Sequence, residues 1–497
     1  MNPVNALRRT ARNAFTVALV CLVAGLHTPA AFAQTSEPHR DQLLNGLRIL
    51  LWSRPGDQNV LLKLRIHSGA AFDMAGKAGT MALLGDALFP DAATHEYFTE
   101  EMGGRLNVET NYDSIDITLQ GRANEYDRIV DILRGALVTT QLTPQNVAKL
   151  REARIKALSD TKHTAADVAD WSLAARLFGS FPYAHPVGGT AESLGRVERA
   201  DLMLARDRFL NPNNATLVIV GGVDQRRGMR ALRQLLGGWR KSEQIVPATF
   251  RQPDLPDPRV LIVNSPGPHS AEVRLATRGV ARSDRDYFAA TLLTVVARDR
   301  WQKLVPDLNK GSFFVRQEAH FLPGVFVMGA SVDNASAAKT LEAARNVLQS
   351  LISSPVLANE LEMAKSGALA VVNSRLSRTD TMADVWLDID TYSLASVDEQ
   401  MRASNAISLA DLQRVAIRLF REVPTASVVV GNGDQLKAEL APTQKIEVMG
   451  EVAAPKAQEQ TSTTNAAPQT RKRTPILITP KNPNPLIKST KPPPKPD

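Results

Sequence analysis

Histidine, cysteine and acidic side chains supply most metal sites and nucleophiles in enzymes, so their positions indicate which chemistry is possible. No two histidines of the globular part are four residues apart, the spacing that places two imidazoles on one helix face. His95-Glu96 begins like a His-Glu-x-x-His zinc motif but lacks the second histidine. No Gly-x-Ser-x-Gly elbow for a serine nucleophile is present. The histidines considered are His67, His95, His163, His185, His269 and His320.

The segment 79–89, which reads Gly-Thr-Met-Ala-Leu-Leu-Gly-Asp-Ala-Leu-Phe, is predicted to form an amphipathic helix because its apolar residues recur at helical spacing. On another face of this helix, Ala82 and Asp86 are four residues apart, with Gly85 beside them. An inverted zinc motif, His-x-x-Glu-His, would place its two imidazoles and its general base on this face. Alanine and glycine donate nothing to a metal, and one aspartate cannot hold catalytic zinc alone. The helix therefore lacks the residues of a zinc site.

The residues around these positions resemble the insulinase/pitrilysin family of zinc peptidases. The corresponding helix of that family reads Gly-x-x-His-x-x-Glu-His-x-x-Phe, and this chain keeps the frame from Gly79 to Phe89 without the histidines and glutamate. Five other segments resemble the family in the same order and spacing, so the resemblance covers roughly residues 40–440. These segments are 104–110, 183–190, 211–214, 279–287 and 360–365.

The resemblance implies a degenerate member of the family that has lost its metal site. The family's third zinc ligand is a glutamate on a later helix, two turns beyond another acidic residue. Glu152 matches that upstream acid, and two turns later the chain has Ser159, so the third ligand is expected to be missing too. We therefore expect no metal cofactor, and zinc would be present only if the chain were a divergent active enzyme.

The resemblance also implies where a peptide would bind. The family's second half carries an arginine and a tyrosine that help to hold substrate near the metal. Here the arginine is replaced by Val305 or Pro306 and the tyrosine by Phe314, which keeps the ring and loses the hydroxyl. The family also has an edge strand that pairs with the substrate backbone, which corresponds here to Leu106, Asn107, Val108 and Glu109.

The elements that must position these residues indicate an α+β fold. Strands come first in the chain and helices pack on them afterwards, unlike the strict alternation of a doubly wound α/β protein. An internal repeat supports two equivalent halves, since Ala200-Asp201-Leu202 and Ala410-Asp411-Leu412 each open a helix that is followed by a strand and a glycine-rich exit. The resemblance implies two sequential homologous half-domains of the insulinase/pitrilysin, processing-peptidase-like type, at residues 40–245 and 250–442.

The first 33 residues are predicted to be a cleaved secretory signal, with basic residues before an apolar stretch at 14–26 and a cleavage site at Ala31-Phe32-Ala33. The apolar stretch is too short for a membrane span, so no membrane anchor is expected after cleavage. Cys21, the only cysteine, lies inside this segment, so the mature chain has no thiol chemistry. A bacterial periplasm fits these features best.

The formal charge of +8 comes mainly from the two ends of the chain, because the body between them is close to neutral. Such a body gives no field that would attract nucleic acid, and no nucleic-acid partner is expected. The segment 452–497 is rich in lysine and proline and cannot bury enough apolar surface to fold, so it is predicted to be disordered.

Three functions remain open. The first is a non-catalytic subunit that pairs with an active zinc peptidase subunit of the same family and binds peptides during periplasmic degradation or processing, by analogy with such pairs in the family. The second is a divergent but active zinc metalloendopeptidase. The third is a stand-alone peptide-binding scaffold.

Overall fold

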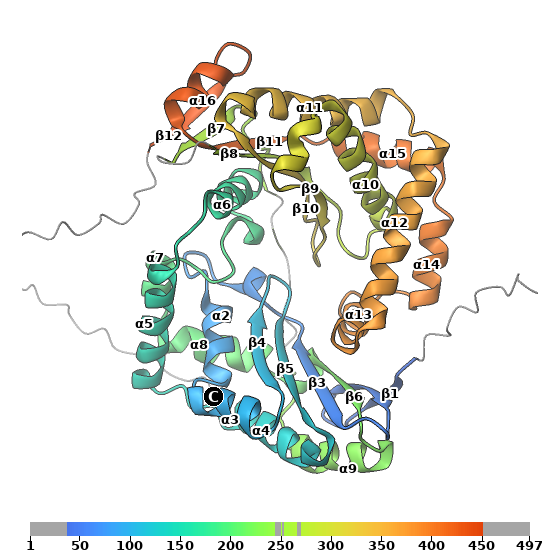
Figure 1. Ribbon diagram of the computed structural model, residues 1–497. Coiled ribbons are helices and arrows are strands. Elements are labelled where there is room, and N and C mark those ends of the chain that lie inside the picture. The colour runs from blue at the N-terminus through green and yellow to red at the C-terminus, as the bar shows by residue number, and fades with distance from the viewer. Residues whose placement is uncertain (1–36, 244–249, 251–252, 266–269, 451–497) are drawn as a thin grey trace, which may run out of the picture. The chain divides into compact units, whose positions relative to one another are not determined.

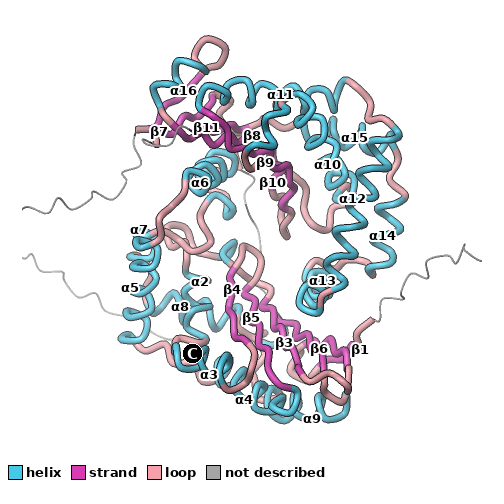
Figure 2. Tube along the Cα trace, in the orientation of Figure 1, coloured by secondary structure: helices cyan, strands magenta, loops and turns pink. Residues whose placement is uncertain are grey.

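The computed structural model describes residues 37–243, 250, 253–265 and 270–450 (Figure 1). The predicted signal at 1–33, the predicted tail at 452–497 and His269 lie outside the described residues. The described strands form two six-stranded sheets, drawn in magenta in Figure 2, and each sheet carries its own helices. Among the described helices, none has the length and apolar composition that crossing a membrane would require.

The first sheet is mixed and has the strand order β1-β2-β6-β3-β5-β4. Only β2 and β6 are parallel neighbours in this sheet. Its strands are β1 (His39–Gln42), β2 (Arg48–Ser53), β3 (Asn59–Ile66), β4 (Arg105–Thr110), β5 (Ile115–Arg122) and β6 (Ala215–Gly221). The helices of this half are α2 (Thr80–Leu88), α3 (Ala92–Glu100), α4 (Tyr126–Val138), α5 (Pro144–Asp160), α6 (Ala165–Phe178), α7 (Ala191–Gly195), α8 (Arg199–Phe209) and α9 (Gln225–Leu236).

The described residues begin with a hairpin in which 43–47 is a turn between β1 and β2. The sequence predicts a strand over 43–50 with a turn signal at Asn45-Gly46, and the structure shows that the turn interrupts it. Gly46 has a φ of 93°, a left-handed conformation that glycine adopts without steric cost. The strand therefore starts at Arg48 rather than at Leu43.

The core of the first half lies on one face of its sheet. Alternate residues of β3 point to opposite faces, so Leu62, Leu64 and Ile66 are buried in the core while Lys63 and Arg65 face the other way. The core face is covered by helices of the same half, which contribute fully buried side chains such as Tyr126 of α4.

The second sheet repeats this plan with the strand order β12-β7-β11-β8-β10-β9. Its strands are β7 (Val260–Asn264), β8 (Ser270–Arg278), β9 (Phe313–Glu318), β10 (Val325–Asp333), β11 (Ala426–Gly431) and β12 (Ile446–Met449). Its helices are α10 (Tyr287–Leu304), α11 (Ala337–Ser353), α12 (Ala358–Ser377), α13 (Thr379–Thr391), α14 (Val397–Asn405), α15 (Leu409–Phe420) and α16 (Gly433–Leu440). Short 3₁₀ turns connect several elements in the two halves, at Ala70–Phe72, Ala123–Glu125, Pro182–Ala184, Pro212–Asn214, Pro306–Lys310 and Asn334–Ser336.

Most elements of the two halves correspond. In each, strands precede a helix beside the edge hairpin, and helices and a central strand, β6 or β11, follow. The outermost strand beside β2 or β7 differs in its place in the chain, because β1 opens the first half and β12 ends the second. The hairpin β4–β5 corresponds to β9–β10, helix α2 to α10, α5 to α12, and α6 to α13. The fold is therefore α+β with two sequential homologous half-domains, as the sequence predicts.

Each half covers the outer face of the other half's sheet with one helix. Leu173 and Leu177 of α6 pack on β8 and β11 of the second sheet. Trp386 and Leu387 of α13 pack on the first sheet, where Trp386 meets Trp52 edge to face with ring centroids 5.6 Å apart. Both faces of each sheet therefore bury apolar side chains, and this burial holds the two halves together.

Matching ion pairs hold the two exchanged helices. Nζ of Lys63 in the first sheet lies 2.6 Å from Oδ1 of Asp384 in α13. Nε of the buried Arg274 in the second sheet lies 2.6 Å from Oδ1 of Asp170 in α6. In both cases a cation on the fourth strand in the order of the sheet, β3 or β8, meets an aspartate on the helix supplied by the other half.

Candidate functional site

Helix α2 is held at its start by the carboxylate of Asp73. The Gly79 N–H donates to one oxygen of Asp73 at 2.6 Å, and the Met81 N–H donates to the other at 2.8 Å. These bonds satisfy backbone donors that have no partner inside the helix. Burial raises the pKa of Asp73 to about 7, against the opposing effect of these two hydrogen bonds and of Arg154.

Two of the three zinc-motif positions on α2 have no side chain that could serve. Ala82 is buried and carries no donor. A Cβ added to Gly85 would lie 2.8 Å from Thr110 Oγ1 and 3.5 Å from a methyl of Val108, so these two side chains of β4 fill the space in which a catalytic glutamate would start. The edge strand thus packs directly on the degenerate face of α2.

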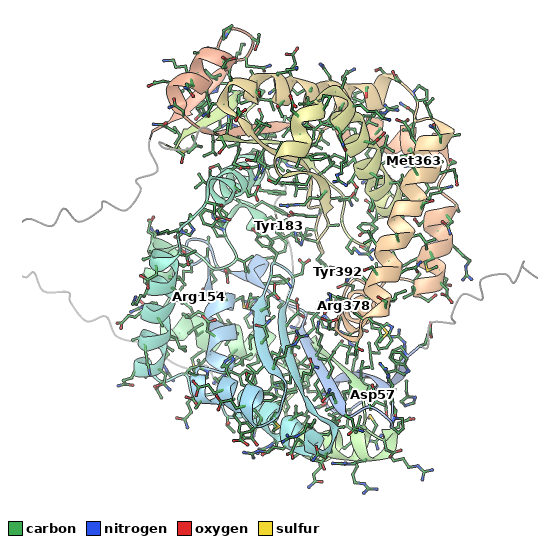
Figure 3. The ribbon with its side chains drawn as sticks, viewed as in Figure 1. Asp57, Arg154, Tyr183, Met363, Arg378 and Tyr392 are labelled. Atoms are coloured by element: carbon green, nitrogen blue, oxygen red, sulfur yellow. The ribbon has the colours of Figure 1, made fainter. Side chains whose placement is uncertain are left out.

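The third position, Asp86, is engaged by an arginine. Its Oδ2 lies 3.1 Å from an Nη of Arg154, which comes from α5 and is labelled in Figure 3. Burial raises the pKa of Asp86, and the Arg154 guanidinium opposes that increase. A metal site on this face would need neutral imidazoles and carboxylates. A permanent cation beside the only available donor disfavours a second cation, so these residues do not fit zinc. Among the described residues, no group of three histidine, cysteine or acidic side chains could hold a metal ion.

Ser159, the predicted position of the missing third ligand, is exposed on α5, and its correspondence to a ligand position stays a prediction. Its side chain is exposed and donates to the carbonyl of Ile155 at 2.9 Å, one turn earlier in α5. Glu152 lies on the same exposed side. Arg154, five residues before Ser159 on another face of α5, contacts Asp86 of α2. Sequence reasoning missed Arg154 as a residue of α5 that contacts this face of α2.

One signal in the sequence could have identified Arg154. The side of α5 that packs on the first half includes Val147, Leu150, Arg154 and Leu158, which recur at helical spacing. A charged residue within an apolar stripe needs a buried partner, and Asp86 is an acidic residue on the neighbouring helix.

The edge strand β4 ends the first sheet, and among the described residues its outer edge has no strand neighbour. Leu106 is buried and Val108 is half-buried on the face toward α2, while Asn107 and Glu109 are exposed on the opposite face. The sequence predicts these four residues to be a peptide contact, and the structure places them together on one strand beside α2. Their contact with a peptide stays a prediction.

The backbone of β4 presents donors and acceptors outward at alternate residues. The Asn111 N–H donates to the carbonyl of Ser114 at 2.9 Å and closes the turn between β4 and β5. Antiparallel pairs alternate from that point, so Glu109 and Asn107 bond to β5. The N–H and C=O groups of Leu106, Val108 and Thr110 therefore point away from the sheet, toward an added strand.

Phe314 lies on β9, the edge strand of the second sheet, and its ring lies over Gly329 on the adjacent strand. The guanidinium groups of Arg316 and Arg274 lie 4.3 and 5.1 Å from the ring centroid. These contacts give Phe314 a packing role beneath α6. Its predicted peptide contact is not tested by this arrangement.

Comparison with protein families gives two consecutive matches along the chain. Residues 48–191 match the family described as insulinase, peptidase family M16, and residues 196–368 match the family described as peptidase M16 inactive domain. The chain belongs to the M16 peptidase family. It is a degenerate member, because the three motif positions on α2 contain Ala82, Gly85 and Asp86.

Curated M16 relatives are distant. The chain is 24% identical over 234 residues to human cytochrome b-c1 complex subunit 1, mitochondrial, a match that covers 45% of this chain and 48% of that protein. It is 24% identical over 216 residues to an uncharacterized zinc protease of Mycobacterium tuberculosis, covering 42% of this chain and 49% of the relative. The chain thus spans about half the length of the curated relatives it matches.

Solved structures share the fold over most of the chain. A protease from Helicobacter pylori superposes with a TM-score of 0.72 at 17% identity, covering 80% of this chain and 100% of that one. A peptidase M16 inactive domain from Pseudomonas fluorescens gives 0.70 at 17% identity, covering 80% and 98%. The first half of the periplasmic protease PqqL from Escherichia coli gives 0.68 at 17% identity, covering 82% and 95%.

Proposed function

We propose that this chain is a non-catalytic M16 subunit that binds extended peptides along β4 and pairs with an active zinc peptidase of the same family. The observation that carries the proposal is the Asp86–Arg154 ion pair at the position of the zinc ligands, directly beside an edge strand whose outward backbone groups remain available. The catalytic chemistry is lost from this site while the surface for backbone pairing is kept.

A catalytic partner would supply what this chain lacks. The chain aligns with about half the length of its curated relatives. Its superposition on the complete PqqL chain covers 87% of this chain and 53% of PqqL. A two-chain assembly would provide a second pair of half-domains with an intact metal site. The predicted signal and the periplasmic PqqL neighbour support a periplasmic location for such an assembly.

The peptide-binding part is tested with two proline variants of β4. Val108→Pro removes an outward N–H and leaves the ladder to β5 intact, so it should weaken peptide binding at least severalfold without unfolding the first half. Asn107→Pro removes an N–H that bonds to β5 and is expected to destabilise the sheet. Binding of a labelled peptide mixture is measured by fluorescence anisotropy, and thermal unfolding is followed by circular dichroism.

The pairing part is tested by pull-down of the tagged mature chain from a periplasmic extract, followed by mass spectrometry. Recovery of an M16 chain with an intact His-x-x-Glu-His motif is the expected result. A lone monomer that binds no peptide would remove the subunit proposal. Chelator-sensitive cleavage by the purified chain alone would instead support a divergent metalloendopeptidase.

A further inference from the structure

The two halves use equivalent pairs of helices beside their edge strands. In the first half, α5 packs on α2, and in the second half α12 packs on α10. Both α2 and α10 lie next to the edge hairpin of their sheet, through contacts with β4 and β9. Each half therefore contains a helix pair whose connecting contacts have a counterpart in the other half.

In the second half, an ion pair links the two helices. The guanidinium of Arg300 on α10 donates two hydrogen bonds to the carboxylate of Glu360 on α12, at 2.9 and 2.8 Å. Both side chains are largely buried, and the Arg300 hydrogen bonds hold the pKa of Glu360 below its ordinary value. A two-point arginine–carboxylate contact fixes both distance and orientation.

In the first half, Asp86 on α2 and Arg154 on α5 also link the two helices, with the charges exchanged between them. This link lies in the C-terminal part of α5, whereas Glu360 lies in the first turn of α12. The resemblance to the zinc peptidases implies that in active members the metal joins these two helices, with two ligands on the first and one on the second. Here Asp86 stands at one of the ligand positions on α2, and Arg154 is the residue of α5 that reaches it.

We propose that the Asp86–Arg154 ion pair replaces the metal as the link between α2 and α5, and that Arg154 occupies the position of the third zinc ligand. The first half is then held together in the way that the second half is held by Arg300 and Glu360. The link acts on β4 as well, because Val108 and Thr110 pack against Gly85, one residue from Asp86. This inference goes beyond peptide binding and does not depend on it.

The link is tested by a double-mutant cycle with Asp86→Asn and Arg154→Gln. If the pair joins the helices, Arg154→Gln should change the unfolding equilibrium constant at least about fivefold less in the Asp86→Asn background than in the wild type. The control pair is Lys156 and Asp160, which contact each other on the exposed side of α5, with Lys156→Gln and Asp160→Asn. Exposed pairs of this kind couple weakly. Coupling between positions 86 and 154 no larger than the control coupling would refute the link.

The ligand position is tested by rebuilding a metal site in two ways. One variant combines Ala82→His and Asp86→His with Arg154→Glu, and the other combines the same two histidines with Ser159→Glu. Gly85 stays unchanged because the general base is not a ligand. After incubation with zinc and dialysis, the Arg154→Glu variant should retain about one zinc per chain by elemental analysis, and the Ser159→Glu variant should retain none.

The rebuilt variant should also melt at a higher temperature with zinc than with a chelator. Zinc retained only by the Ser159→Glu variant, or by neither variant when both are folded, would overturn the assignment of Arg154. If the histidine variants do not fold, the double-mutant cycle still decides whether the ion pair links the helices, because its substitutions remove charge without adding bulk.

Discussion

Asp86 shows how one substitution changes the electrostatics of a site. A histidine at this position could serve as a neutral ligand, whereas a half-buried carboxylate needs a compensating cation. Arg154 supplies that cation at 3.1 Å. The absence of the zinc motif and the presence of the arginine are therefore consistent with each other, because the carboxylate of Asp86 needs a compensating cation and Arg154 provides it.

At this scale we expect the purified mature chain to hold no stoichiometric zinc. Ala82 and Gly85 provide no donor, and Asp86 is paired with a cation. Elemental analysis after purification without added metal measures the content. About one tightly held zinc per chain would contradict the assignment as a degenerate member that lacks a metal site.

The triple substitution Ala82→His, Gly85→Glu and Asp86→His is expected not to restore peptidase activity. Arg154 would remain at the third-ligand position, and the new glutamate would begin 2.8 Å from Thr110 Oγ1. Hydrolysis of a quenched fluorescent peptide, with and without a chelator, measures the outcome. Strong chelator-sensitive cleavage would show that the third ligand comes from elsewhere.

At the scale of elements, α13 lies on the first sheet through several charged contacts as well as apolar ones. Arg65, which is largely buried, meets Asp116 of its own sheet at 2.6 Å and Asp388 of α13 at 2.8 Å. His67 lies beside this contact, with its Nε2 2.9 Å from Thr216 Oγ1 and 3.7 Å from a carboxylate oxygen of Asp390. Burial, together with the charges of Arg48 and Arg65, lowers the pKa of His67 to about 3.

We therefore expect acid to destabilise the docking of α13. The folded state keeps His67 neutral, while the unfolded state gains a proton as the pH falls below about 6.5, so the stabilisation is present above that pH and is lost below it. Between pH 6.5 and 5 the wild type should lose up to about 1.4 kcal/mol per pH unit relative to His67→Gln. Urea unfolding of both proteins at several pH values measures this difference, and parallel pH profiles would rule out His67 as the cause.

At the scale of the whole unit, each half completes the other. The apolar side chains on the outer face of the first sheet are covered by α13, and those on the outer face of the second sheet are covered by α6. The first set comprises Leu50, Leu61, Val218 and Val220. The turn after β4 adds a polar contact between the halves, since Asp113 accepts hydrogen bonds from the hydroxyl of Tyr392 at 2.8 Å and from the N–H of Phe321 at 3.0 Å. Figure 3 labels Tyr392 on the second half and Tyr183, whose hydroxyl also donates to Asp113.

Separate production of the halves, divided between residues 243 and 253, should therefore give fragments that aggregate or lack fixed tertiary structure. Produced together, they should associate, because each fragment covers an apolar face of the other. Size-exclusion chromatography and near-ultraviolet circular dichroism measure the result. Two soluble, cooperatively folded fragments would contradict the expected dependence of each half on the other.

In the intact chain, Trp386→Ala should lower the free energy of unfolding by about 3–5 kcal/mol.

The sequence alone was sufficient for features that depend on local pattern. The helix at 79–89, the repeat of the Ala-Asp-Leu helices and the loss of donors at Ala82 and Gly85 follow from residue type and spacing, and the structure and the family match agree with them. Only the tertiary structure decided which face of α5 meets α2. Glu152 and Ser159 share one face and Arg154 lies on another, and spacing cannot tell which face packs inward when both contain polar residues. The exchange of α6 and α13 between the sheets was likewise invisible, because a helix pattern shows that an apolar face must be buried and does not specify the surface that buries it.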